Sequence, residues 1–175
     1  MLDKKRIKEA EQNVKSYLSD GLLIKKVLNE HVLKILINNG KESLRVADEV
    51  NNQKISYLWT IVCSYYSMFY YANAILLKFG YKVGDKIVHK VTSDAMIVYV
   101  KNKLEESLLE DYEDNRKEAL ILAGIKTDSL LESLDFERNK RSHIQYNMGE
   151  AKKYAKAQTS LKRAKIFAKE MEKIL

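Results

Sequence analysis

The chain contains no proline and only six glycines among its 175 residues. These two residue types most often end helices and form turns, so few positions in this sequence break a helix. Apolar residues also recur at helical spacing along nearly the whole chain, which predicts an all-α protein. Asn38, Asn39 and Gly40 are expected to end a helix. The predicted helices cover residues 3–19, 22–37, 42–50, 56–79, 93–116, 127–146 and 150–175.

Length and composition predict a single globular unit. The chain is 46% hydrophobic, which is enough apolar material for one buried core, and it is too short for two domains of usual size. The only cysteine, Cys63, excludes an internal disulfide framework and a cysteine-rich zinc site. Residues 1–12 are charged from the third position on, unlike a secretory signal. We therefore expect a cytoplasmic protein.

The most apolar segment covers residues 56–79 and carries no charge between Lys54 and Lys78. It is long enough to span a bilayer, but its many tyrosine, serine and threonine residues make insertion unfavourable. We interpret it as the central helix of a soluble bundle, closed by Gly80, and expect no membrane association. Its tyrosines could stack on nucleobases, but aromatic residues at helical spacing more often belong to a core.

A loop over residues 81–89 is expected to follow, with His89 at its end. A histidine at a turn usually forms a hydrogen bond with the backbone, and we favour that interpretation over a catalytic role. The next predicted helix begins at Ser93, with Ser93 or Thr92 as its N-cap.

The formal net charge is +7, and much of the excess lies in the last predicted helix. Lysine and arginine neutralise phosphates, so polyanions such as RNA are plausible partners. The alternative is an ordinary solvated, lysine-rich face. From residue 150 onward three residues are acidic and eight are basic, namely Lys152, Lys153, Lys156, Lys162, Arg163, Lys165, Lys169 and Lys173.

The apolar stripe of the predicted helix 127–146 becomes polar at Arg138. At about 100° per residue, Arg138 continues the row of leucines before it, whereas Asn139 and His143 lie together on an adjoining face. Unpaired polar groups in a core row are costly. Arg138 is therefore either paired with a carboxylate such as Asp135 or Glu137, or it lines a wet cleft that receives a ligand.

Residues 138–143 have the sequence RNKRSH: an Arg followed directly by Asn, then three further residues and a His. This order and spacing are similar to the signature motif of the HEPN superfamily. Residues 64–90 look like the other recurring stretch of that family: a helix of tyrosines and small residues, a glycine, and a loop that ends in His and Lys. The chain resembles this family over residues 41–175. Residues 1–40 are similar to the helical extension of some archaeal members.

The resemblance implies an up-and-down four-helix bundle over residues 41–175, with an N-terminal helical extension over residues 1–40 and a short additional helix. It also implies a homodimer in which the Arg and His side chains face each other across the interface. Many members are metal-independent endoribonucleases, so no cofactor is expected. Many are also toxins that are balanced by a nucleotidyltransferase-type antitoxin. In that chemistry His143 acts as general base or acid, Arg138 stabilises the phosphate charge, and Asn139 orients His143 or the phosphate.

Further residues extend this hypothesis. Lys140, Arg141, Lys152 and Lys153 are candidates for contacts with the RNA backbone. Members silenced by adenylylation carry a tyrosine two residues after the His, whereas this chain has Gln there and Tyr146 one position later. Tyr146 is thus a candidate regulatory residue or a structural hydroxyl. The alternative functions are a non-catalytic HEPN module that binds RNA, a nucleotide or a partner protein, and a structural adaptor.

Overall fold

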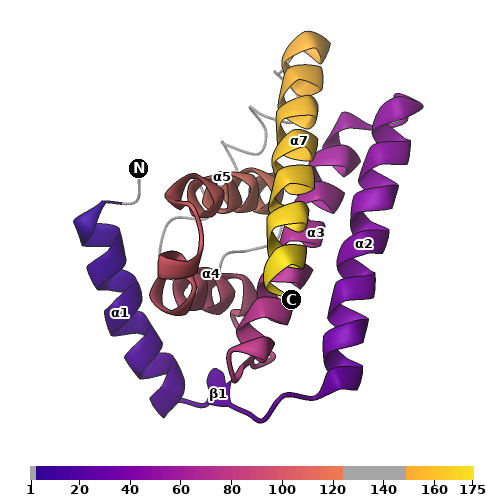
Figure 1. Ribbon diagram of the computed structural model, residues 1–175. Helices are drawn as coiled ribbons and strands as arrows, with labels where there is room; N and C mark the ends of the chain where they lie inside the picture. Colours follow the sequence, from indigo (N-terminus) through magenta and orange to yellow (C-terminus); the bar gives the residue numbers. More distant parts are fainter. Residues whose placement is uncertain (1–2, 124–148) are drawn as a thin grey trace.

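The computed structural model describes residues 3–123 and 149–175 (Figure 1). The described part is mostly helical, which confirms the all-α prediction; the HEPN-like four-helix arrangement stays a prediction. The predicted helix 127–146 lies outside the described residues. In chain order the elements are α1 (Lys4–Ser19), β1 (Leu23–Lys25), α2 (Glu30–Asn52), α3 (Tyr57–Lys78), β2 (Tyr81–Val83), α4 (Val88–Tyr99), the 3-10 turn η1 (Lys101–Lys103), α5 (Glu106–Ala123) and α7 (Glu150–Ile174).

Helix α3 is the centre of the fold, as the sequence predicted. It contacts α2, α4, α5 and α7. Helix α1 packs against α4 on the side of the molecule opposite to α2 (Figure 1). Most residues of α3 are buried, and Tyr65, Met68 and Tyr71 are among the largest side chains of the core. Tyr65 and Tyr71 are therefore core residues, as the favoured interpretation expected, whereas Tyr57, Tyr66 and Tyr70 are only partly buried. No helix in the described ranges is long and apolar enough to cross a membrane.

Helix α2 runs without interruption through Gly40, so the predicted helix end there is wrong. Gly40 is buried against Tyr71 of α3, and a Cβ built on it would lie 2.9 Å from two ring carbons. The glycine therefore allows two helices to approach closely and does not cap one. The boundary placed between residues 40 and 41 falls inside α2, and the division into extension and bundle stays a prediction.

Two short strands replace part of what the sequence predicted as helix and loop. β1 and β2 pair antiparallel, with Leu23 opposite Val83 and Lys25 opposite Tyr81. The Gly84 amide extends the pairing by donating to the Leu22 carbonyl at 2.9 Å. Strands of three residues are too short to leave an alternating pattern in the sequence. They tie the linker after α1 to the linker between α3 and α4.

The helix predicted over residues 93–116 is two helices. α4 begins at Val88 and ends at Tyr99, and α5 begins at Glu106. The end of α4 is held by ring stacking of Tyr99 on Tyr81, with centroids 3.9 Å apart. Neither glycine nor proline marks this break in the sequence. Ser93 lies inside α4 and is not its N-cap.

Candidate functional site

The predicted catalytic residues Arg138, Asn139 and His143 lie outside the described residues. The same holds for Lys140 and Arg141, predicted to contact RNA, and for Tyr146, the candidate regulatory residue. The arrangement of these six side chains therefore stays a prediction.

Lys152 and Lys153, the other predicted RNA contacts, lie in the first turn of α7. The Lys152 side chain is exposed. Lys153 is half-buried, and its Nζ lies 3.4 Å from Oε1 of Glu150. Of the two, Lys152 is thus the cation without an ion pair to another described residue. Both lie at the end of α7 that follows the predicted motif in the chain.

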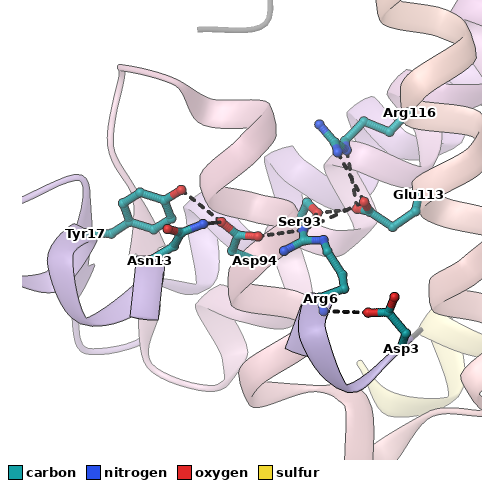
Figure 2. A network of polar contacts seen from close by, with 8 residues as sticks. All are labelled: Asp3, Arg6, Asn13, Tyr17, Ser93, Asp94, Glu113 and Arg116. Carbon is teal, nitrogen blue, oxygen red and sulfur yellow. Dashed lines mark hydrogen bonds and ion pairs between the residues drawn. The ribbon is translucent and has the colours of Figure 1, made fainter. Parts of the chain in front are cut away.

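The most elaborate polar site in the described residues is a buried network that joins α1, α4 and α5 (Figure 2). Its centre is Asp94 of α4, which is completely buried. Arg6 of α1 reaches the middle of α4 and places Nη2 2.6 Å from Oδ1 of Asp94. The same guanidinium donates to the Ser93 hydroxyl at 3.1 Å. An isolated buried carboxylate would be strongly unfavourable, so Arg6 is its principal compensation.

Two neutral side chains of α1 complete the contacts of Asp94. Nδ2 of Asn13 and the hydroxyl of Tyr17 each donate to Oδ2 of Asp94 at 2.9 Å. Burial, together with the nearby Asp94 charge, raises the pKa of Tyr17, so its hydroxyl stays protonated and donates. One face of α1 thereby supplies a cation and two hydrogen-bond donors to one carboxylate of α4.

Glu113 of α5 is the second buried carboxylate, and it lies beside the first. The Ser93 hydroxyl donates to its Oε1, and Arg116 contacts both of its oxygens, at 3.3 Å and 3.1 Å. Arg6 reaches it more distantly, with Nη2 3.8 Å from Oε2. Burial alone would raise the pKa of Glu113, but the Arg116 charge and these hydrogen bonds outweigh burial and lower it. Glu113 is thus held as a carboxylate.

A second cluster surrounds His89 at the start of α4. Nδ1 of His89 lies 2.8 Å from the Tyr65 hydroxyl, and its ring packs on Phe69 with centroids 4.7 Å apart. The interpretation that His89 bonds the backbone at a turn missed this side-chain partner. Burial, and then the neighbouring Tyr112, raise the pKa of Tyr65. Tyr65 therefore holds the histidine as a neutral hydroxyl.

The backbone at the start of α4 is strained. Ile87, the residue before the helix, has a φ of +42°, a left-handed conformation that β-branched residues rarely adopt. Such a conformation costs about 1 to 3 kcal/mol and persists only where its surroundings enforce it. Two residues later, the His89 ring contacts the aromatic side chains of α3.

The sequence analysis did not single out Arg6, Asp94 or Glu113. Asp94 had one usable signal: it is the only charged residue in an apolar run over residues 91–100. A charge in such a run is either buried with a partner or functional. Its partner Arg6 lies on a distant helix, and nothing in the sequence pairs the two.

Chemically, the network of Figure 2 balances two buried carboxylates with two guanidinium groups. This composition suits a structural role, because each charge is already engaged. In the described ranges no group of three or more His, Cys, Asp or Glu side chains is placed to hold a metal ion. Comparison with protein-family models, with curated proteins and with solved structures finds no match to this chain.

Proposed function

We propose that this protein is a HEPN-domain endoribonuclease that works without a metal ion and acts as a homodimer. The observation that carries the proposal is the sequence RNKRSH at residues 138–143, in a chain that is otherwise almost free of helix-breaking residues. The order of the elements supports it, since a tyrosine-rich helix precedes the motif in the chain. The basic composition supports a polyanionic substrate.

The contact between Tyr65 and His89 gives a second, weaker support. Both residues belong to the stretch over residues 64–90 that resembles the family. Their side chains are joined at 2.8 Å, so the tyrosines of α3 and the histidine after the glycine form one structural unit.

In the proposed reaction His143 removes the proton from a ribose 2′-hydroxyl. The 2′-oxygen then forms a bond with the adjacent phosphorus, and the bond from phosphorus to the 5′-oxygen breaks. Arg138 stabilises the charge that builds on the phosphate oxygens, and Asn139 orients the histidine or the phosphate. The leaving 5′-oxygen takes up a proton. The products are a 2′,3′-cyclic phosphate and a 5′-hydroxyl, and the step needs no cofactor.

The decisive experiment is cleavage of mixed structured RNAs in EDTA by the wild type and by His143→Ala. The matched control is His31→Ala, because His31 is exposed on the first turn of α2. The proposal expects cleavage by the wild type and by His31→Ala, no cleavage by His143→Ala, and cyclic phosphate ends on the product. Absence of cleavage by folded wild-type dimer contradicts an enzyme and favours the non-catalytic module.

The dimer is part of the proposal and has its own test. Light scattering at micromolar concentration should give twice the chain mass of 20.3 kDa. A monomer would remove the basis for a cleft shared between two Arg138 and His143 pairs. A nucleotidyltransferase-type antitoxin remains a proposed partner, and modification of Tyr146 in its presence is the corresponding measurement.

A further inference from the structure

Helices α2 and α7 lie side by side on the outside of the molecule and run in opposite directions (Figure 1). A groove of about 430 Å³ opens along the contact between them. We call it the α2–α7 groove and define it by its charged lining: Lys41, Arg45 and Asp48 from α2, and Lys165, Lys169 and Glu172 from α7. Four cationic and two anionic side chains leave it with a net charge of +2.

Two ion pairs cross the groove, one toward each end. Nζ of Lys165 lies 2.6 Å from Oδ1 of Asp48, and Nζ of Lys41 lies 3.4 Å from Oε1 of Glu172. In both helices the paired residues are seven positions apart, which is about 10 Å along a helix axis. The two pairs therefore fix the register of the helices, and both carboxylates of the groove lining are paired with a lysine.

Arg45 and Lys169 lie between these two ion pairs in the register, and both line the groove. Both side chains are exposed, and neither has an ion pair or hydrogen bond with another described residue. Two cations on facing helices repel each other, and both carboxylates of the groove lining are already engaged by lysines. This middle position therefore attracts an anion from solution.

The floor of the groove argues for a phosphate and against a nucleobase. Tyr71 lines it, but the tyrosine is only 1% exposed, its ring packs beneath Gly40, and its hydroxyl donates to Glu172 at 2.7 Å. Base recognition needs an accessible aromatic face or unpaired donors and acceptors at the base edge. The groove instead offers cations, which position a nucleic-acid backbone without reading its sequence.

We infer that the α2–α7 groove binds the sugar-phosphate backbone of RNA, with one phosphodiester held between Arg45 and Lys169. The inference rests on the proposed function, which supplies RNA as the substrate, and it adds a binding surface formed by residues other than the predicted motif. Lys162, one helical turn from Lys165 on the same face of α7, is exposed and extends the row of cations beyond the groove. The backbone then follows α7 from the groove toward Lys152.

The test measures RNA affinity separately from cleavage. The probe is a fluorescent single-stranded RNA of about 16 nucleotides, bound to His143→Ala so that it is not cut. Arg45→Gln and Lys169→Gln are introduced together, and the control replaces two exposed lysines of α1, Lys8→Gln and Lys15→Gln. Both double variants lose the same charge. Affinity is measured between about 50 and 200 mM salt, because each phosphate contact to single-stranded RNA contributes about 0.7 to the slope of log K against log salt.

The inference expects the groove variant to lower that slope by about 0.7, the contribution of one phosphate contact, and the α1 control to leave it unchanged within about 0.3. Equal loss in both variants would mean that only total charge matters and would overturn the groove as a site. An unchanged slope in the groove variant would overturn it as well. Loss of binding to poly-glutamate without loss of RNA binding would identify an acidic peptide as the ligand and also overturn it.

Failure of the inference and failure of the proposed function are distinguishable. If wild type cleaves RNA and the groove variant binds RNA normally, the ribonuclease stands and the groove inference falls. If wild type does not cleave but the groove variant loses the expected slope, the groove stands as an RNA-binding surface on a non-catalytic module. Circular dichroism of both double variants confirms that the helices are retained.

Discussion

Nη2 of Arg6 lies 2.6 Å from Oδ1 of Asp94, which joins the first turns of α1 to a completely buried carboxylate of α4. The guanidinium is 24% exposed, so the pair lies at the edge of the core rather than in its centre. This contact is one of several that join α1 to α4, and its removal leaves the Asp94 charge without its main partner.

Replacing Arg6 with Met should destabilise the protein by about 2 kcal/mol. Loss of one partner from a buried pair costs about 3 to 5 kcal/mol, but Asn13 and Tyr17 still donate to Asp94 and reduce the effect. The midpoint of urea unfolding measures it. Lys5→Met, an exposed neighbour, is the control and should stay within about 0.5 kcal/mol of wild type. Equal midpoints for the two variants would contradict a structural role for the pair.

Glu113 should make the protein less stable in acid. Its pKa is lower in the folded protein than the ordinary value of 4.5, so the unfolded chain takes up a proton at a higher pH than the folded one. The stability that it contributes is present above about pH 4.5 and is lost as pH falls through the lower folded value. Glu113→Gln should therefore flatten the acid side of a plot of unfolding free energy against pH.

Asp111 provides the opposite case on the same helix. Burial raises its pKa, so its contribution is greatest at low pH and declines as pH rises through the folded value. Asp111→Asn should slightly steepen the acid side of the plot of unfolding free energy against pH, whereas Glu113→Gln flattens it. If both variants changed this side of the plot in the same direction, the assignment of the acid sensitivity to Glu113 would be wrong.

Gly40→Ala should destabilise the protein although alanine favours helix. The helix gains about 1 kcal/mol, but the new Cβ would meet the Tyr71 ring at 2.9 Å, and overpacking of this kind costs about 1 to 3 kcal/mol. Thermal unfolding gives the net change. Tyr71→Leu in the same chain removes the ring carbons from the contact, so the effect of Gly40→Ala should become neutral or stabilising there. A stabilising effect with Tyr71 intact would show that the ring moves away without cost.

Arg45→Glu should stabilise the fold slightly. It replaces a cation that faces Lys169 with a carboxylate that can pair with it, and exposed pairs contribute about 0.2 to 1 kcal/mol. Unfolding in urea at low and high salt measures the gain, which should shrink at high salt. Arg45→Gln should give roughly half of the gain in stability expected for Arg45→Glu. A loss of stability at low salt would mean that Arg45 has a favourable partner in the fold.

The sequence predicted the helical class and the central position of α3 because both follow from periodicity and burial. The sequence-based prediction of helix ends failed where contacts between distant parts of the chain are involved. Gly40 looked like a helix end because nothing in the sequence reports the ring of Tyr71 beneath it. The break between α4 and α5 was missed because no glycine or proline marks it, and the stacking of Tyr99 on Tyr81 beside it joins residues far apart in the sequence.

The polar sites illustrate the same limit. Asp94 could have been noticed as a charge in an apolar run, but its donors Arg6, Asn13 and Tyr17 come from a separate helix. The register of Lys41 with Glu172 likewise depends on two helices far apart in the chain. Short motifs such as RNKRSH are visible in sequence because their residues are neighbours, whereas sites assembled from distant helices are not.

The attachment of α1 also sets an order of events during synthesis. Arg6 donates to Ser93, which follows it by 87 residues, and the strand after α1 pairs with a strand beyond α3. A growing chain therefore releases α1 from the ribosome long before its docking surface exists. Until α4 has been made, the face that carries Arg6, Asn13 and Tyr17 stays in water, and a short helix without tertiary partners is only marginally stable there. Helix α1 thus waits for partners that are made much later.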